Sequence, residues 1–224
     1  MLRITDTVKH LILINIAMYF GTLFLLGQGP ESPMSLIAGD NYNLGDWQRL
    51  SLAMFYPESP FFRPYQIITH MFMHASIGHL FFNMFALYMF GSALESVWGR
   101  SKFLKFYFIT GLGALALYLG VKFIELNYMG EPVYSENIPM LGASGAVFGL
   151  LAGFGFMFPE SRIMLLIPPI PMKAKYFVLI FGAIELFLGI ANIGSGIAHF
   201  AHVGGALFGF LTLYYWKSDG NLYS

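Results

Sequence analysis

Residues 197–216 have the sequence IAHFAHVGGALFGFLTLYYW, which contains no Asp, Glu, Lys or Arg. A helix of about 20 apolar residues is long enough to cross the hydrocarbon core of a bilayer. Two histidines and a pair of glycines spaced by four interrupt the apolar run: His199, His202, Gly205 and Gly209. Because polar side chains cost free energy in lipid, the stretch predicts a membrane span whose histidines face the protein interior or a water-filled cavity.

The whole chain has the composition of an integral membrane protein. Of its 224 residues, 57% are hydrophobic and only 11% are charged, against about 25% charged in soluble domains. Such a composition excludes an ordinary soluble domain and a disordered chain. The 12 basic and 12 acidic residues cancel, so the charge gives no indication of a nucleic-acid partner. The chain has no cysteine, which excludes disulfides, thiol catalysis and Cys-ligated metals.

Six apolar stretches, separated by Pro- and Gly-containing connections, are long enough to be membrane spans. They run over approximately residues 11–26, 78–97, 103–124, 142–158, 176–193 and 197–216. The first resembles the core of a signal peptide, but no small-x-small cleavage site follows it, so we expect it to be retained. The fold class expected is an all-α integral membrane protein, with a single domain over residues 1–224 built as a six-helix bundle.

The basic residues predict the orientation of this bundle, because cytoplasmic loops are enriched in Lys and Arg. With six spans both termini lie on the same side, together with nine of the 12 basic residues: Arg3, Lys9, Arg100, Lys102, Lys105, Arg162, Lys173, Lys175 and Lys217. We therefore expect both termini in the cytoplasm and the protein in the cell (inner) membrane. The long outer segment 27–77 mixes aromatic and turn residues, which is typical of a loop at the membrane interface.

A serine between glycines opens the fourth apolar stretch, in Gly142-Ala-Ser144-Gly145. Pro139 stands just upstream, so Ser144 is expected at or near a helix start, where unpaired N–H groups stabilise a developing oxyanion. The flanking glycines would let a substrate backbone approach the hydroxyl. The alternative is a serine that only caps the helix.

His202 is the candidate base for this serine. It shares a helix face with Gly205 and Gly209, and the fourth stretch has a matching row of small residues: Gly145, Gly149 and Gly153. Small residues let transmembrane helices pack closely, so we expect the fourth and sixth spans to touch. Contact would bring His202 next to Ser144, where an imidazole can accept the hydroxyl proton. The alternative is a histidine that only makes an interhelical hydrogen bond.

His79 and Asn83 are one helical turn apart on the second span, so they share a face. Both side chains can donate hydrogen bonds to a carbonyl oxygen that becomes negative, and one such donor is worth about 3 kcal/mol of barrier. Their alternative role is hydrogen bonding between helices.

Five motifs in this order, over roughly residues 60–215, resemble the rhomboid family of intramembrane serine proteases. They are Arg63-Pro-Tyr-Gln-Ile-Ile-Thr-His-Met-Phe-Met-His74, His79-Leu-Phe-Phe-Asn83, Gly91-Ser-Ala-Leu-Glu95 with Gly99, Gly142-Ala-Ser144-Gly145 and Ala201-His202-Val-Gly-Gly205-Ala-Leu-Phe-Gly209. The chain looks like the minimal bacterial-type form of the family, with six spans.

The resemblance implies a Ser144–His202 dyad with no third acid, which forms an acyl-enzyme, and an oxyanion site made by the Ser144 N–H, His79 and Asn83. It implies substrates that are transmembrane proteins, contact with membrane lipids, and no metal or organic cofactor; it leaves the oligomeric state open. In two positions the chain departs from the family pattern. Phe62 replaces a tryptophan before Arg63, and Phe148 replaces a tyrosine, which keeps a surface for stacking on the histidine ring but loses the hydroxyl.

Two other functions fit part of the sequence. His70 and His74, like His199 and His202, have the spacing of metal ligands, which would suit a membrane metalloenzyme, but the chain has no His-Glu-x-x-His. A non-catalytic family member that binds membrane clients usually lacks the serine or the histidine, and both are present here. His70, His74 and His199 are expected to form hydrogen bonds. Glu185, within the fifth apolar stretch, would suit a proton path or a third catalytic acid, but we expect it to be a structural partner because the dyad pattern assigns it no such role.

Overall fold

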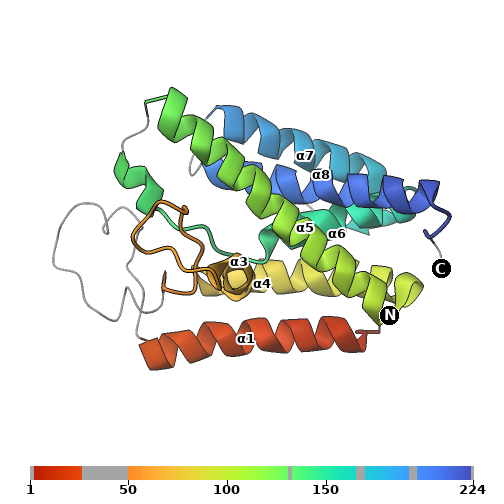
Figure 1. The fold of residues 1–224 in the computed structure, drawn as a ribbon. Helices are drawn as coiled ribbons and strands as arrows, with labels where there is room; N and C mark the ends of the chain where they lie inside the picture. The colour runs from red at the N-terminus through yellow and green to blue at the C-terminus, as the bar shows by residue number, and fades with distance from the viewer. Residues whose placement is uncertain (1–2, 27–49, 131–132, 165–169, 192–195, 223–224) are drawn as a thin grey trace. The chain divides into compact units, whose positions relative to one another are not determined.

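The computed structural model of the chain describes residues 3–26, 50–130, 133–164, 170–191 and 196–222. It has two compact units. The first unit comprises Met1–Lys9, Phe85–Tyr118 and Ser144–Ser224, and the second comprises His10–Met84 and Leu119–Ala143. Helices make up most of both units (Figure 1). Part of the expected interfacial loop (residues 27–49), part of the 158–173 connection and the end of the fifth predicted span lie outside the described residues.

The elements follow one another in the order α1 (Asp6–Leu26), α3 (Gln66–Thr69), a 3-10 turn (His70–Phe72), α4 (Ile77–Ala86), a π-helical turn (Leu87–Gly91), α5 (Ser92–Tyr128), a second 3-10 turn (Val133–Asn137), α6 (Ser144–Met157), β1 (Arg162–Met164), β2 (Pro171–Lys173), α7 (Ala174–Ile190) and α8 (Gly196–Ser218). Strands β1 and β2 pair in antiparallel fashion, with Ile163 opposite Met172. The expectation of helices alone did not include this short ribbon.

Gly99 interrupts the longest helical stretch, Ile77–Tyr128, which has 52 residues. Its φ of 73° and ψ of 171° are not helical, and a positive φ is a conformation that glycine adopts without steric cost. The predicted spans 78–97 and 103–124 lie on either side of this break. Among the described residues, Asp6–Leu25 and Ile77–Tyr128 are long and apolar enough to cross a membrane, and Ser144–Met157 is a shorter apolar helix. The count of six spans stays a prediction.

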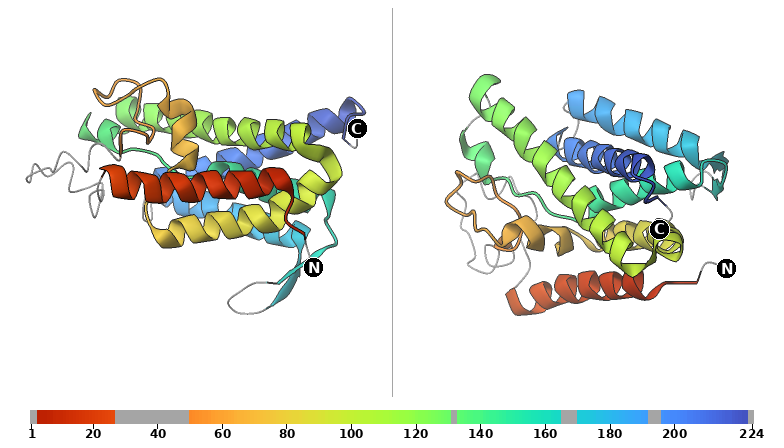
Figure 2. Two further views of the ribbon diagram at one scale, coloured as in Figure 1. Left: turned by 90° about the horizontal axis from the view of Figure 1, so that it is seen from below. Right: turned by 45° about the vertical axis from the view of Figure 1, so that its right-hand side comes forward.

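Helices α5 to α8 pack together in the first unit, where α8 contacts both α6 and α7 (Figures 1 and 2). Near the end of α6 the ring centroid of Phe156 lies 6.0 Å from that of Phe210 on α8. The starts of these two helices also meet, at Ser144 and His202, so α6 and α8 run in the same direction. Trp98, near the start of α5, has its ring centroid 5.6 Å from that of Trp216, near the end of α8; these two helices run in opposite directions.

Glycines on α8, which have no side chain, allow this helix to lie directly on the α6 backbone. A Cβ added to Gly205 would collide with the carbonyl oxygen of Gly145, and one added to Gly209 would lie 3.0 Å from the carbonyl oxygen of Gly149. The glycine row of α6 differs from the expectation, because its own open side faces α5 rather than α8. A Cβ on Gly145 would meet the side chain of Ala114. The α6 glycines therefore serve the packing of α5, while the α8 glycines serve the contact between α6 and α8.

Large apolar side chains point outward from α7, as expected for a helix that faces lipid. Leu179, Phe187 and Ile190 are 69%, 64% and 71% exposed. A soluble protein rarely exposes a continuous row of such residues. This exposure agrees with the membrane composition of the sequence.

One end of the first unit gathers most of its basic residues. Lys102, early in α5, donates a hydrogen bond to the carbonyl of Asn221, just after α8. Glu160, which follows α6, pairs with Lys173 at 2.6 Å and also with Lys175. These Lys side chains hold the pKa of Glu160 at about 2. The basic residues at this end, Arg3, Arg100, Lys102, Arg162, Lys173, Lys175 and Lys217, belong to the set that the sequence placed on the cytoplasmic side.

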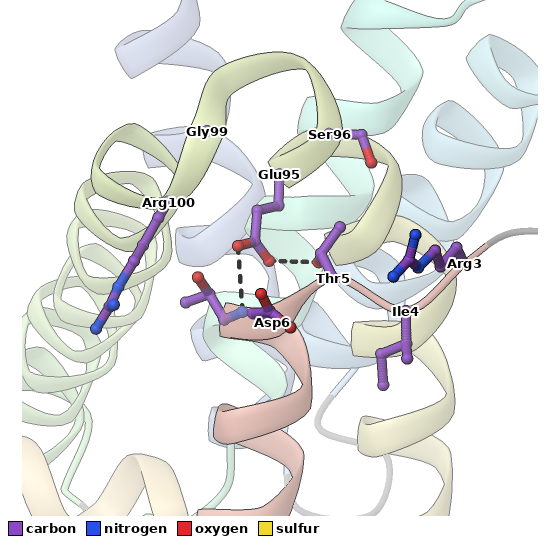
Figure 3. Close-up of a pocket in the computed structure, with 9 residues that line it drawn as sticks. Arg3, Ile4, Thr5, Asp6, Glu95, Ser96, Gly99 and Arg100 are labelled. Atoms are coloured by element: carbon purple, nitrogen blue, oxygen red, sulfur yellow. Dashed lines mark hydrogen bonds between the residues drawn. The ribbon is translucent and has the colours of Figure 1, made fainter.

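Glu95 ties the start of α1 to α5 at this same end. Its carboxylate accepts hydrogen bonds from the backbone N–H groups of Thr7 at 3.2 Å and Val8 at 3.0 Å, and from the hydroxyl of Thr5. Figure 3 shows the Glu95 side chain pointing toward Thr5 and the first turn of α1, in a pocket that Arg3 also lines. The first N–H groups of a helix have no partner within it, so a carboxylate placed there stabilises α1.

In the second unit a buried glutamine forms hydrogen bonds with several backbone groups of residues 50–77. Gln66 is fully buried, and its amide nitrogen donates to the carbonyl oxygens of Ser51 at 2.9 Å and Phe61 at 3.0 Å. Its amide oxygen accepts from the backbone N–H of Arg63 at 3.0 Å. Around it Leu50, Ala53 and Phe55 form an apolar cluster on which Phe61, Phe62 and Leu141 pack. This part of the segment therefore has a core of its own.

Candidate active site

A serine and a histidine from two different helices meet in the first unit. Ser144 is the first residue of α6, and His202 lies in the second turn of α8. The Oγ atom of Ser144 is 2.9 Å from the Nε2 atom of His202. The close contact of Gly205 with the α6 backbone lies one turn further along α8. The two residues that the sequence singled out are thus within hydrogen-bonding distance.

Phe148 supports the ring of His202. The two rings are stacked, with centroids 4.4 Å apart and planes 6° apart. The stacking expected from the sequence for this position is therefore confirmed. The phenyl ring of Phe148, which is parallel to the imidazole, restricts rotation of the His202 side chain.

The other nitrogen of His202 contacts an acid on α7. Its Nδ1 atom is 2.8 Å from Oε2 of Glu185, and the Nδ1 atom of His199 is 2.6 Å from the same oxygen. The side chains of Glu185, His199 and His202 are 15%, 19% and 21% exposed. Ser144, His202 and Glu185 therefore form a continuous chain of a hydroxyl, an imidazole and a carboxylate.

From the sequence we expect Glu185 to be a structural partner, with a third catalytic acid as the alternative, and the contact with His202 was not predicted. The signal that could have revealed it is a carboxylate within an apolar stretch, which needs a partner because an unpaired charge is costly in lipid. The two Nδ1 atoms of an i, i+3 histidine pair on the neighbouring span were the suitable donors.

His79 and Asn83 both lie on α4, in the second unit. The Nδ2 atom of Asn83 donates to the carbonyl oxygen of His79 at 2.9 Å, one turn earlier. The ring of His79 meets the ring of His74 edge-on, with centroids 5.1 Å apart. The two residues thus share one side of α4.

His70 and His74 are buried in the second unit. The Nδ1 atom of His70 lies 2.8 Å from the carbonyl oxygen of Gln66, to which it donates. Burial lowers the pKa of His70. Burial, reinforced by the neighbouring His79, lowers the pKa of His74 to about 4. At neutral pH both rings are therefore uncharged side chains within the core of this unit.

Glu185, His199 and His202 also form the group of potential metal ligands within the described residues, with ligand atoms no more than 4.8 Å apart. In a tetrahedral zinc site with bonds near 2.0–2.1 Å, ligand atoms are about 3.3 Å from one another. The two contacts to Glu185 measure 2.6 and 2.8 Å, which are distances of direct hydrogen bonds. The geometry therefore favours a hydrogen-bonded network at these three residues.

In chemical terms the site can prepare a nucleophile. An imidazole nitrogen within hydrogen-bonding distance of a hydroxyl can take its proton as the oxygen attacks, and later return it to a leaving group. Ser144 also stands at the first position of α6, where backbone N–H groups lack intrahelical partners. The arrangement suits acyl transfer.

Comparison with known proteins identifies relatives over most of the chain. The family model described as Rhomboid domain matches residues 62–218. The chain is 34% identical to Rhomboid protein 1, mitochondrial, of Saccharomyces cerevisiae, over 67% of this chain and 40% of the yeast protein. It is 29% identical to Rhomboid protease AarA of Providencia stuartii over 90% of this chain and 69% of that protein. It is also 29% identical to Rhomboid protease GluP of Bacillus subtilis, over 66% of this chain and 25% of GluP. The chain thus spans less than half of the yeast and Bacillus relatives.

Proposed function

The chain belongs to the rhomboid family of membrane proteins, and from this premise we propose that it is an intramembrane serine endopeptidase. Its nucleophile is Ser144 and its general base is His202. The relatives AarA and GluP carry the name rhomboid protease, which supports a hydrolase. The observation that carries the proposal is the 2.9 Å distance between Ser144 Oγ and His202 Nε2.

The proposed reaction has two halves. As Ser144 Oγ attacks the carbonyl carbon of the scissile peptide, His202 Nε2 takes the hydroxyl proton. The C–N bond then breaks, the proton passes from Nε2 to the leaving amine, and an ester remains on Ser144. Water, deprotonated by the same Nε2, attacks this ester and releases the new carboxylate, which restores the serine hydroxyl.

We propose that the oxyanion formed in each half is stabilised by the Ser144 N–H together with His79 and Asn83. The position of Ser144 at the start of α6 supports the first donor, because N–H groups there are free of intrahelical bonds. The location of His79 and Asn83 one turn apart on α4 supports a joint role for the other two. Each donor of this kind contributes about 3 kcal/mol of barrier lowering.

The substrates we propose are transmembrane segments of other membrane proteins, which would reach the site from the lipid. The protein would be one six-span domain in a cell membrane with both termini cytoplasmic, in the orientation that the basic end of the first unit supports. The relatives include proteins named as mitochondrial and proteins of bacteria, and the bacterial inner membrane is the setting that we propose for this chain.

The proposal is tested by labelling the detergent-purified protein with a fluorophosphonate and identifying the modified peptide by mass spectrometry. We expect a single adduct on Ser144, its absence in Ser144→Ala, and unchanged labelling in Ser96→Ala, a helical serine whose hydroxyl donates to the Ser92 carbonyl. An adduct on another residue, or an unlabelled protein, would contradict the proposal and favour a member that binds clients without cleaving them.

A further inference from the structure

Glu185 lies at the junction of α7 and α8, and one of its oxygens, Oε2, accepts two hydrogen bonds. The donors are Nδ1 of His202 at 2.8 Å and Nδ1 of His199 at 2.6 Å. A dyad of serine and histidine does not use this carboxylate. The carboxylate nonetheless contacts Nδ1 of His202, and the protonation of Nδ1 determines whether the opposite ring nitrogen, Nε2, can accept a proton.

The bond to Glu185 fixes the tautomer of His202. An ionised carboxylate has only acceptor atoms, so the nitrogen 2.8 Å away must be the one that carries the hydrogen. A neutral imidazole has one N–H, and the other nitrogen is then a bare acceptor. That other nitrogen is Nε2, which lies 2.9 Å from Ser144 Oγ. Glu185 therefore directs a lone pair, rather than a hydrogen, at the serine.

His199 has a supporting place in this network. It donates to the same oxygen and its ring meets that of His202 edge-on, with centroids 6.2 Å apart. A carboxylate held by two donors from adjacent turns of α8 has little freedom to rotate. The second bond thus keeps Oε2 in line with Nδ1 of His202.

We propose that Glu185 is a positioning residue for the reaction, which holds His202 in the Nδ1–H tautomer and stabilises the imidazolium formed when His202 takes the Ser144 proton. The proposal rests on the proposed serine endopeptidase function. It extends the pair of Ser144 and His202 to three groups in contact, of which Glu185 is the third. His199 holds the Glu185 carboxylate in place. In other serine enzymes, loss of the aspartate that fills this role lowers kcat by about 10⁴. Because Glu185 is partly exposed, we expect a smaller loss, at least about tenfold.

The test compares Glu185→Asp, Glu185→Gln and Glu185→Ala in proteoliposomes, with kcat and KM measured on a transmembrane substrate that the wild type cleaves. Leu186→Ala, at an exposed neighbouring position on α7, is the matched control. We expect Asp to retain more activity than Gln, since Asp keeps a charged acceptor while the amide of Gln can turn a donor toward Nδ1. A role in packing alone would give the reverse order, because Gln has the size and shape of Glu. The loss should appear in kcat, with KM within about twofold.

A spectroscopic measurement reads the tautomer directly. With ¹⁵N-labelled histidine in detergent, the His202 signals, assigned by their loss in His202→Asn, should show a protonated Nδ1 and a bare Nε2 in the wild type. In Glu185→Gln we expect the proton to move to Nε2 or to be shared. Wild-type kcat in Glu185→Gln, or an unchanged tautomer, would overturn the inference. If Ser144→Ala remained active, the proposed function itself would fail, whatever the Glu185 variants do.

Discussion

The Nε2 atom of His202 lies 2.9 Å from the Oγ atom of Ser144, although the two residues are 58 positions apart in the chain. The contact depends on two helix starts that meet because α8 lies directly on the α6 backbone at Gly205. The local geometry of the site is therefore a consequence of helix packing, and this can be tested by substitution.

Gly205→Leu should separate α6 from α8 at the site. A Cβ at this position would collide with the carbonyl oxygen of Gly145, the residue that follows Ser144, and overpacking of this kind typically costs about 1–3 kcal/mol. We expect a lower melting temperature and at least a tenfold slower reaction of Ser144 with a fluorophosphonate. The control is Gly182→Leu on α7, where an added Cβ meets nothing within 4 Å. Equal labelling rates in the two variants would show that the close contact is unnecessary.

Phe148→Leu should weaken the site without removing any reacting atom. The substitution removes the ring stacked 4.4 Å from that of His202, and such pairs contribute about 0.5–1.5 kcal/mol. We expect kcat to fall by up to about tenfold, while Phe148→Tyr, which keeps the ring, stays close to wild type. Phe187→Leu, at a position 64% exposed on α7, controls for loss of an aromatic ring in general. A Phe148→Leu enzyme as fast as the wild type would show that the stack has no role.

His79→Ala and Asn83→Ala should each reduce turnover by roughly 10- to 1000-fold, the range for loss of one oxyanion donor. The effect should fall mainly on kcat, because the donors act on charge that develops in the transition state. Asn127→Ala is the matched control, since Asn127 makes the same bond to a carbonyl four residues earlier, at 2.9 Å, as Asn83 does. If the Asn83 and Asn127 variants had equal turnover, the side chain of Asn83 would serve only its hydrogen bond within α4.

The stability of the protein should fall as the pH is lowered from 6.5 to 4. Burial and the nearby His79 lower the pKa of His74 to about 4, while in the unfolded chain it is about 6.5. Between these values the unfolded state holds a proton that the folded state does not, so unfolding becomes easier by up to about 3 kcal/mol. Above pH 6.5 the effect is absent.

Thermal unfolding in detergent at several pH values measures this effect. In His74→Gln the decrease in melting temperature between pH 6.5 and 4 should be smaller than in the wild type. His10→Gln, a substitution of an exposed histidine on α1, should leave the wild-type curve unchanged. If the melting temperatures of the wild type and of His74→Gln changed with pH in parallel, the pKa of His74 would be the same in the folded and unfolded states.

Much of the site could be predicted from the sequence because its signals are local. Ser144 and His202 each stand among small residues, and glycine rows at helical spacing predict which helices approach closely. Gly99 lies between the predicted spans 78–97 and 103–124, and its positive φ of 73° marks the break between them. In these cases residue type and spacing along one segment were enough.

Other features could not be predicted because they depend on how segments meet. The glycine row of α6 opens toward α5, a direction that spacing alone does not give. The bond from His202 to Glu185 joins residues on two helices. It depends on which face of α7 is turned toward α8, which residue spacing along one helix does not give. The ribbon of β1 and β2 has three residues in each strand, too few to give an alternating pattern.

The central claim is most directly tested by the proteolysis of single-span membrane proteins in liposomes by the wild type and by Ser144→Ala, with Ser96→Ala as the control. Removal of one oxygen should leave the fold and melting temperature intact, so we predict that Ser144→Ala produces no cleavage while Ser96→Ala cleaves like the wild type. Cleavage by purified Ser144→Ala at the wild-type rate and site would contradict the assignment of this serine as the nucleophile.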